Sequence, residues 1–457
     1  MSDTIAAIVT PAGEGGVGLL RISGPEALAL ARGLFHPAEA VVSFAPSPWR
    51  VYFGEIRDPA GGTLVDEVLL TFYKAPKSFT AEDVVEIAAH GGMYITSRIL
   101  DLIVGAGARL AEPGEFTRRA FQNGRIDLSQ AEAVAGVIAA QSERALMASL
   151  DQLKGRLSAR LNDQYERLIA VIAQLEASID FPEEGLKFQK SEALKNDIDG
   201  VAGEMDALIE SYRQGKIISE GARVAIVGKP NAGKSSLLNA LLAEDRAIVT
   251  PHPGTTRDLI EERVRIRDIH IRIIDSAGLR KHPEVIEEEG IERTRAALAG
   301  ADLALMLFDA SQPLDENDEL LLAEAAGKKK LVVLNKCDLP ERLDTAALLG
   351  RLAGEEPVRI SAREQTNLGA LVDAIHDRVL GGEAREPLLL TRARHREQLV
   401  DARQALSRAG DSLGQGLSEE FIALDVDAAA QCLGRILGKV YSEDLLDEIF
   451  NEFCIGK

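Results

Sequence analysis

The chain has 457 residues, a length that predicts roughly three domains of about 150 residues each. Its 52 basic and 72 acidic side chains give a net charge of −20, so the chain as a whole would repel bare nucleic acid unless a local patch or a partner supplies positive charge. Three cysteines without a C-x-x-C pair argue against a disulfide framework or a zinc site and indicate a reducing, cytoplasmic setting. Without a run of about 18 apolar residues or a basic leader, we expect neither a membrane span nor a signal peptide.

The first 115 residues or so alternate short strand-like segments with turn residues, which is typical of an α+β fold. We expect strands in IAAIVT, GLLRIS, WRVYFGEI and VDEVLLTFY, and helices around PEALALARGLF and GGMYITSRILDLIVGAG. Gly13, Gly15 and Gly18 spell G-x-G-x-x-G, but a dinucleotide fingerprint must open a helix. The segment LLRIS and a turn follow instead, so we reject a dinucleotide site here.

Two other regions have a helical pattern, and a region of a different, α/β type lies between them. No proline occurs between Pro113 and Pro182, and apolar residues there fall at helical spacing, namely Tyr165, Leu168, Ile169, Ile172, Leu175 and Ile179. A second helical block runs from about residue 385 to the end. Between about 217 and 383, strand-like segments alternate with helical ones, which predicts a largely parallel sheet. We therefore expect an α/β domain inserted into a discontinuous helical domain, because insertions succeed where the termini of the guest lie close together.

These patterns divide the chain into four segments. Residues 1–118 form the N-terminal α+β domain, and residues 217–383 form the inserted α/β domain. Residues 119–216 and 384–457 form the two parts of the helical domain.

The α/β segment begins with a phosphate-binding motif. G-x-x-x-x-G-K-S runs from Gly228 to Ser235, after an apolar strand and before a helical pattern, which is the context that this motif requires. Its glycines let backbone N–H groups and the helix N-terminus face phosphates. Lys234 can reach the terminal phosphates, and the Ser235 hydroxyl can bind Mg²⁺. Thr256, in the segment TPHPGTTRD, is the natural second hydroxyl for Mg²⁺.

Later motifs favour guanine over adenine. The segment Asp275–Gly278 (DSAG) suits contacts with Mg²⁺ and the γ-phosphate, and Asn335–Asp338 (NKCD) offers a carboxylate that can accept two hydrogen bonds from guanine. Ser361 and Ala362 lie where a final base-contacting loop is expected. The sequence thus predicts a GTPase. The expected GTP-binding residues are Asn231, Ala232, Gly233, Lys234, Ser235, Ser236, Thr250, Thr255, Thr256, Asp275, Gly278, Asn335, Lys336, Asp338, Ser361 and Ala362.

Two catalytic parts of a GTPase are missing from their usual places. Leu279 stands where Ras-like enzymes have the glutamine that orients the attacking water, so a residue of the acidic run at 284–289 could take that role. The charge of the transition state also needs a cation, and an arginine finger is worth roughly 10³ to 10⁵ in rate. Arg257 and Arg280 are candidates, and so is a metal ion beside Asn231.

The whole chain resembles the MnmE (TrmE) family of tRNA-modification GTPases. The resemblance lies in TPAGEGGVGLLRISGP, SFTAEDVVEIAAHGG, EPGEFTRRAFQNGRIDLSQAEAV, GKPNAGKSSLLNALL and the terminal FCIGK. It implies an N-terminal tetrahydrofolate-binding and dimerisation domain, a discontinuous helical domain and an inserted Ras-like G domain. It also implies a cytoplasmic homodimer that works with the flavoprotein MnmG, which alone carries FAD.

The resemblance further implies what this complex does. It installs a carboxymethylaminomethyl-type group on the wobble uridine of certain tRNAs, with a 5-formyl or 5,10-methylene tetrahydrofolate as one-carbon donor and GTP hydrolysis to drive the conformational cycle. A different class of function stays open, namely a regulatory GTPase switch such as a ribosome-assembly factor. Only the first hypothesis requires the chain to bind a folate.

The site residues that the resemblance implies are these. K⁺ is held by Asn231, Thr250, His252 and Thr255, the catalytic glutamate is Glu287, and the folate residues are Arg21, Glu86, Arg125 and Lys457. Taken alone, either Arg21 or Glu86 would more readily be a member of some structural ion pair. Arg125 stands where relatives often have lysine, which keeps the charge and changes the geometry.

The C-terminal CIGK leaves two interpretations. Cys454 is either a bystander thiol at a helix end, or the tail folds back toward the folate pocket. In the second case Lys457 reaches the ligand and Cys454 acts as a nucleophile, because a nearby cation lowers the pKa of a thiol.

Overall fold

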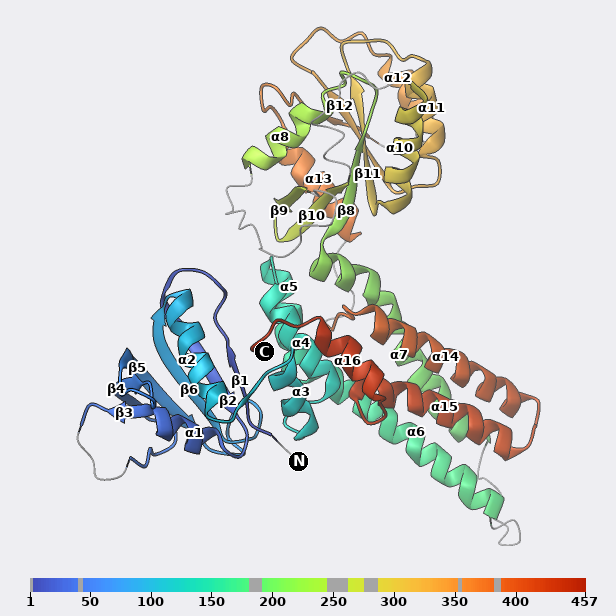
Figure 1. Cartoon of the computed structure of the whole chain (residues 1–457). Helices are drawn as coiled ribbons and strands as arrows, with labels where there is room; N and C mark the ends of the chain where they lie inside the picture. The colour runs from blue at the N-terminus through green and yellow to red at the C-terminus, as the bar shows by residue number, and fades with distance from the viewer. Residues whose placement is uncertain are drawn as a thin grey trace. The chain divides into compact units, whose positions relative to one another are not determined.

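The computed structural model describes residues 3–39, 44–180, 191–244, 262–274, 287–351, 356–381 and 388–457. Contacts group the chain into two compact units, one of residues 1–138, 151–199 and 404–457, and the other of residues 139–150 and 200–403. Each unit contains a β-sheet, and the helices α5 (Glu143–Leu153), α7 (Ser191–Glu220) and α14 (Ala393–Gly414) contribute residues to both (Figure 1). The last residue of α4 (Leu128–Ala139) also belongs to the second unit.

The first unit contains a seven-stranded sheet in the order β3-β4-β5-β6-β2-β1-β7. Its strands are β1 (Ile5–Ile8), β2 (Gly15–Ser23), β3 (Phe35–Pro37), β4 (Val51–Arg57), β5 (Leu64–Tyr73), β6 (Val84–Gly91) and β7 (Arg109–Leu110). Its helices are α1 (Ala27–Leu34), α2 (Met93–Gly105), α3 (Glu115–Gln122), α4 (Leu128–Ala139), α6 (Arg156–Asp180), α15 (Glu419–Leu437) and α16 (Glu443–Asn451).

Helices α1 and α2 cover one face of this sheet (Figure 1). Leu20 and Ile87 on the strands and Ile99 and Ile103 on α2 are fully buried between the two layers. The four strands and two helices expected here are confirmed, and the G-x-G-x-x-G segment leads into strand β2 rather than into a helix. Sequence reasoning did not single out β6, which lies between β5 and β2 at the centre of the sheet.

A charged network ties the start of the first unit's sheet to α3. Arg119 is 8 % exposed, and it donates hydrogen bonds to the Asp3 carbonyl at 2.7 Å and to Glu115 Oε1 at 3.0 Å. The Asp3 carboxylate accepts bonds from Arg109 and Arg119, which lower its pKa to about 2. Since a depressed pKa favours the folded state above the ordinary pKa of the group, this contribution is present at neutral pH and lost in strong acid.

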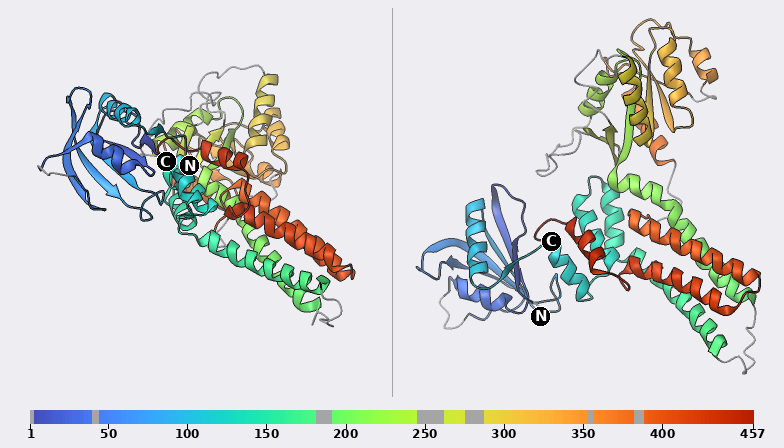
Figure 2. Two further views of the ribbon diagram at one scale, coloured as in Figure 1. Left: turned by 60° about the horizontal axis from the view of Figure 1, so that its bottom comes forward. Right: turned by 45° about the vertical axis from the view of Figure 1, so that its right-hand side comes forward.

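Helices α6 and α15 lie side by side in the helical part of the first unit (Figure 2). The helix expected around Tyr165 is confirmed as α6, but its buried stripe is partly displaced from the expected one. Leu168 and Leu175 are buried as expected, whereas Ile169 is 41 % exposed and Val171 is buried instead. The apolar pattern correctly predicted a helix, whereas packing against α15 determines which of its residues are buried.

The second unit contains a six-stranded sheet in the order β13-β12-β11-β8-β10-β9. Its strands are β8 (Ala222–Val227), β9 (Glu262–Ile266), β10 (Ile269–Ile274), β11 (Leu303–Asp309), β12 (Lys330–Asn335) and β13 (Val358–Arg359). Its helices are α8 (Lys234–Glu244), α10 (Glu287–Gly300), α11 (Glu316–Glu324), α12 (Thr345–Arg351) and α13 (Leu368–Leu380).

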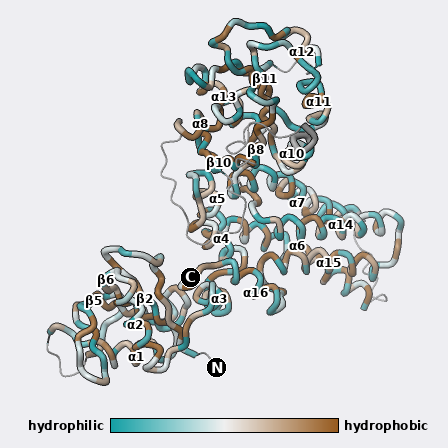
Figure 3. Tube along the Cα trace, turned by 45° about the horizontal axis from the view of Figure 1, so that its top comes forward, coloured by the Kyte–Doolittle hydropathy of each residue, from teal (hydrophilic) through white to brown (hydrophobic). Residues whose placement is uncertain are grey.

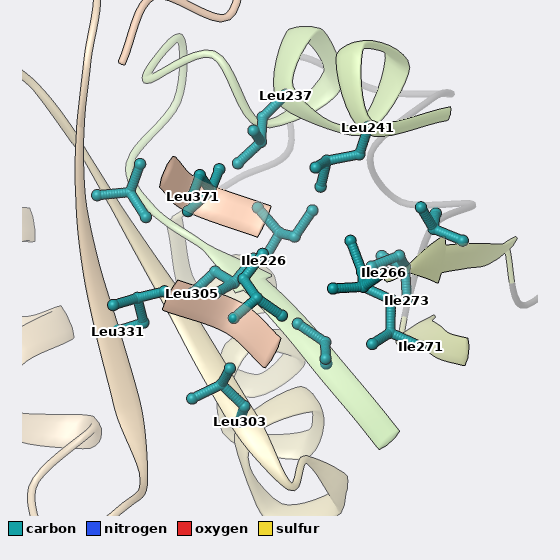
Figure 4. Packing of buried hydrophobic residues seen from close by; sticks show 14 of the residues in the cluster. Ile226, Leu237, Leu241, Ile266, Ile271, Ile273, Leu303, Leu305, Leu331 and Leu371 are labelled. Carbon is teal, nitrogen blue, oxygen red and sulfur yellow. The ribbon is translucent and has the colours of Figure 1, made fainter. Parts of the chain in front are cut away.

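All neighbouring strands of this sheet are parallel except β9 and β10, so the largely parallel sheet is confirmed. Ile226 of β8, Leu305 of β11, Leu241 of α8 and Leu371 of α13 pack in one buried cluster (Figure 4). The hydrophobic colour of β8 and β11 in Figure 3 follows from their burial in the middle of the sheet. Parallel strands leave their carboxyl ends at one edge, where ligands bind in folds of this kind.

Continuous helices cross two of the expected segment boundaries. The boundary after residue 118 falls inside α3, and the boundary after residue 216 falls inside α7. The boundary after residue 383 lies outside the described residues, and the four-segment division stays a prediction. None of the helices in the described ranges combines the length and the apolar character needed to cross a bilayer.

Candidate functional site

The phosphate-binding loop connects β8 to α8 in the second unit. A Cβ on Gly228 would meet the Leu307 carbonyl at 2.5 Å, so the loop begins against β11 and no larger residue fits there. Asn231 and Gly233 have φ values of 60° and 99°, and such left-handed residues occur where consecutive N–H groups converge on an anion. Lys234, Ser235 and Ser236 then form the first turn of α8. The expected strand–loop–helix context of the motif is therefore present.

The ammonium of Lys234 lies inside this loop. Its Nζ donates to the carbonyls of Gly228 at 2.6 Å and Lys229 at 2.9 Å. Burial lowers the pKa of Lys234, and no carboxylate within the described ranges is paired with it. A phosphate placed at the loop would stabilise the charged form, which is the chemistry expected of a P-loop lysine.

Asn335 joins three of the expected nucleotide-binding segments. It is 2 % exposed at the end of β12, and its Nδ2 donates to the Ala232 carbonyl at 2.9 Å. Its Oδ1 accepts from the Ala362 backbone N–H at 2.9 Å. A Cβ on Gly233 would lie 2.2 Å from the Asn335 amide, so the loop and β12 approach each other closely only because residue 233 is glycine.

We predict that Asn335→Ala weakens GDP binding by about tenfold. In the variant two buried backbone groups lose their hydrogen-bond partners, at a cost of about 1 to 3 kcal/mol each. Only part of that cost lowers the affinity, because the rest destabilises the free protein as well. Isothermal titration of the full chain with GDP measures the change. Asn317→Ala, on the exposed first turn of α11, is the matched control and should bind GDP as the parent does. Equal affinity of the Asn335 variant and the parent would contradict this reading of the junction.

The first unit contains a pocket of about 550 Å³ where β5 ends and the antiparallel strand β6 begins. That volume lies within the range of small-molecule sites. The pocket is lined by Trp49, Tyr73, Pro76, Lys77, Ser78, Phe79, Val84, Glu86 and Arg125.

The wall of this pocket combines charged groups with aromatic rings. Arg21 donates two hydrogen bonds to Glu86 Oε1, at 2.9 and 2.8 Å, and the Tyr73 hydroxyl donates to Glu86 Oε2 at 3.2 Å. Burial, followed by the negative charge of Glu86, raises the pKa of Tyr73. The guanidinium groups of Arg21 and Arg125 lie 5.1 and 5.2 Å from the centroid of the Phe79 ring, and burial lowers the pKa of Arg125.

The C-terminal tail returns to the N-terminal sheet next to this pocket. Ile455 forms an isolated antiparallel bridge with Pro113, and the Lys457 carbonyl accepts a hydrogen bond from the Phe116 N–H at 3.1 Å. The Phe116 ring lies 5.5 Å from the Arg21 guanidinium. Gly456 has a φ of 95°, and a Cβ there would come 2.7 Å from the Ile8 carbonyl, so the glycine of CIGK allows the close approach.

Comparisons with known proteins place the chain in a family. The sequence model described as GTP-binding protein TrmE N-terminus matches residues 4–125, and the one described as MnmE helical domain matches residues 128–454. The tRNA modification GTPases MnmE of Syntrophus aciditrophicus (strain SB) and Moorella thermoacetica (strain ATCC 39073 / JCM 9320) are 44 % and 45 % identical to this chain, with 100 % of each chain covered. The chain belongs to the MnmE family of tRNA modification GTPases. Among solved structures, the FeoB G-domain of Methanococcus jannaschii covers 35 % of this chain and 97 % of its own, at 24 % identity and a TM-score of 0.26.

Membership of the MnmE family confirms three sequence predictions. The chain is a GTPase, and, as a GTPase of this family, it binds GTP and Mg²⁺. Its fold combines an α+β N-terminal domain, a discontinuous helical domain and an inserted G domain. Ser235, on the first turn of α8, fits a hard cation because its hydroxyl is an oxygen donor.

The structure of this MnmE-family chain brings together part of each expected site. Ala232, Asn335 and Ala362 meet through hydrogen bonds, Ser361 is buried beside Ala362, and Asp338 is exposed after β12. Other expected residues lie outside the described ranges, namely Thr250, His252, Thr255, Thr256, Arg257, Asp275, Gly278 and Arg280. Glu287 begins α10, and its side chain is also outside the described part.

Only some of the expected folate residues line the pocket of this MnmE-family chain. Glu86 and Arg125 line the pocket, and Arg21 forms an ion pair with Glu86, so each of these two residues is an ion-pair member, as the sequence alone favoured, and their partners are each other. Lys457 contacts Phe116 through its backbone, and it is not among the lining residues. Cys454 has an exposed free thiol, and its backbone carbonyl accepts a hydrogen bond from the Gly114 N–H at 3.5 Å.

Sequence reasoning missed the aromatic members of the pocket. Trp49 is 60 % exposed with a φ of 65°, and its ring meets that of Tyr73 at 4.9 Å between centroids. It is the only tryptophan of the chain, which was a usable signal, whereas Tyr73 and Phe79 lie in segments that read as ordinary strand and loop. Lys229 and Asp309 were also missed, and Asp309 Oδ2 lies 2.7 Å from Lys336 Nζ.

Proposed function

We propose that this chain is a K⁺-dependent GTPase that works with the flavoprotein MnmG on the wobble uridine of certain tRNAs. The modification is of the carboxymethylaminomethyl type, and a tetrahydrofolate derivative held in the Trp49–Glu86–Arg125 pocket supplies the one-carbon unit. The observation that carries the proposal is this pocket, which has a carboxylate, a cation and aromatic rings within one cavity of about 550 Å³.

The chemistry of the pocket suits a folate. The pyrimidine ring of a reduced pterin has a flat conjugated surface and N–H donors, and the folate tail ends in carboxylates. Each carboxylate oxygen has two lone pairs, and Arg21 donates two bonds to Glu86 Oε1, so Oε2 can accept one hydrogen bond from a ligand in addition to that from Tyr73. Arg125 can pair with a carboxylate in two-pronged geometry, and Trp49 and Phe79 offer ring faces for stacking.

The open face of the N-terminal sheet supports a homodimer. Val51, Phe53 and Leu69 are 62 %, 54 % and 45 % exposed on neighbouring strands β4 and β5. Phe53 and Leu69 are direct cross-strand partners, so these side chains form one apolar patch. Glu86 of β6 is paired with Thr71 of β5, in the same sheet as this patch. A second copy docked on the patch would bury it close to the folate pocket.

K⁺ would supply positive charge beside the transferring phosphoryl group, the role that an arginine finger has in other GTPases. Asn231, with Thr250, His252 and Thr255 of the following segment, would hold it, and Ser235 with Thr256 would hold Mg²⁺. The amide oxygen of Asn231 is a suitable ligand for a hard cation. The backbone of Asn231 is left-handed, with a φ of 60°, in this structure. Glu287 would position the attacking water.

We expect 5-formyltetrahydrofolate to change the fluorescence of Trp49, since the single tryptophan lies at the pocket. In the full chain Glu86→Gln should weaken this binding by about tenfold, the order of one charged hydrogen bond. GTP turnover by the same variant should equal that of the parent, because Glu86 is in the other unit. Glu67→Gln, an exposed carboxylate on β5, is the matched control.

This titration also separates the two functions that the sequence left open. A regulatory GTPase switch would bind GTP and give no change in Trp49 fluorescence with the folate at any concentration. The net charge of −20 further indicates that tRNA is held largely by the complex rather than by this chain alone. Tight and specific tRNA binding by the isolated chain would count against that part of the proposal.

A further inference from the structure

Lys229, the second residue of the phosphate-binding motif, reaches from the loop to the first turn of α11. Its Nζ lies 2.9 Å from Asp318 Oδ2 and 3.0 Å from Asp315 Oδ2. Asp315 is the N-cap of α11, and Asp318 completes a capping box with it. The loop is therefore tied to the start of a helix that follows a different strand, β11.

This contact is largely removed from solvent. The side chain of Asp318 is 2 % exposed and that of Lys229 is 12 % exposed, whereas ordinary surface ion pairs are solvated and contribute little. Burial raises the pKa of Asp318 in spite of its bonds to Lys229, and its Oδ1 has no hydrogen-bond partner in the described part of the chain. Because a buried carboxylate is costly without a cation, Lys229 is the group that allows Asp318 to be charged there.

The backbone of Lys229 connects the same contact to the nucleotide site. Its carbonyl accepts the Lys234 ammonium at 2.9 Å and the Ala232 N–H at 3.3 Å. The first bond orients the lysine that faces the phosphates, and the second closes the turn that carries Asn231. Any force that fixes the position of Lys229 therefore fixes both parts of the loop.

We propose that the Lys229–Asp318 ion pair positions the phosphate-binding loop for nucleotide binding, with α11 as its support. Lys229 and Asp318 are positioning residues, since they act on the nucleotide through the Lys229 carbonyl and Lys234. The proposal depends on the GTPase activity of the family and not on K⁺ or folate. A residue with a merely structural role would change the stability of the protein and leave the affinity of the folded protein for GDP unchanged.

The test compares Lys229→Met, Asp318→Asn and the double variant in the full chain, with a fluorescent GDP analogue as the probe. We expect each single variant to raise the Kd about tenfold through faster dissociation, as for the loss of roughly one charged hydrogen bond. The double variant should match Lys229→Met within about twofold, because both changes break the same link. Lys229→Arg, which keeps the charge and the reach, should retain most of the affinity.

The control is Glu324→Gln at the other end of α11. It breaks the exposed ion pair with Arg295 and should leave the Kd unchanged. A lower melting temperature with an unchanged Kd in both single variants would overturn the proposal, and so would effects that multiply in the double variant. If Lys229→Met does not fold, Asp318→Asn, which keeps the shape of the side chain, carries the test with the same expected Kd.

Discussion

Replacing K⁺ by Na⁺ at constant ionic strength is expected to lower GTP turnover of the full chain by roughly 10²-fold. A cation beside the transferring phosphoryl group is worth about 10³ to 10⁵ in rate when an arginine finger supplies it, and a misfitting ion retains part of that effect. Asn231, with a φ of 60° in the phosphate loop, is one of the proposed ligands of this ion, and Na⁺, which is smaller than K⁺, would fit the same set of oxygen donors less well. Steady-state phosphate release in the two salts measures the ratio.

Equal rates in the two salts would return the role to Arg257 or Arg280. The two explanations separate further in the variants Arg257→Ala and Arg280→Ala, assayed in K⁺. If the ion supplies the charge, both variants keep turnover within about threefold of the parent, since neither removes the cation that contacts the phosphates. If either arginine supplies the charge, the corresponding variant loses activity in both salts.

Glu287→Ala is expected to slow GTP hydrolysis by roughly 10² to 10³-fold, the usual effect of losing a group that handles a reacting water. GDP and GTP affinity should stay close to those of the parent, because we expect the nucleotide to be bound by the phosphate loop and the segments that Asn335 joins to it, and not by Glu287. Single-turnover hydrolysis together with equilibrium binding separates the two effects.

The matched control for Glu287 is Glu292→Ala, an exposed glutamate further along the same helix. It should leave turnover unchanged. A collapse of nucleotide affinity in Glu287→Ala would make that residue structural, and the water would then need another partner in the acidic run at 284–289.

The sequence predicted the G domain in detail because the chemistry of phosphates and guanine leaves few alternatives. The motif from Gly228 to Ser235 requires a strand before it and a helix after it, and β8 and α8 are present. The role of Lys229 was not predicted, since its position in the motif accepts any residue and its partner Asp318 is 89 residues away. A contact of this kind depends on how β11 and α11 lie relative to β8, which a local pattern does not contain.

The N-terminal pocket shows the same division between chemistry and placement. Resemblance identified Arg21, Glu86 and Arg125, whose charges suit a folate. Trp49 has a left-handed backbone, and it reaches the pocket because its N–H bonds to the Phe72 carbonyl at 2.8 Å on the neighbouring strand. Periodicity carries no information about such a turn. The tail from Cys454 to Lys457 likewise gave no periodic signal, and its approach to Ile8 and Phe116 depends on long-range pairing.

We propose that this single chain joins GTP hydrolysis to a folate-dependent step on tRNA. The most direct test is the yield of modified wobble uridine from tRNA, GTP, a tetrahydrofolate donor, MnmG and either the parent chain or Glu86→Gln. With the folate donor below saturation, we predict that the variant hydrolyses GTP at the parental rate and loses about nine-tenths of the modified nucleoside, in line with a tenfold weaker folate site. Equal yields from the parent and the variant would contradict the assignment of the Trp49–Glu86–Arg125 pocket.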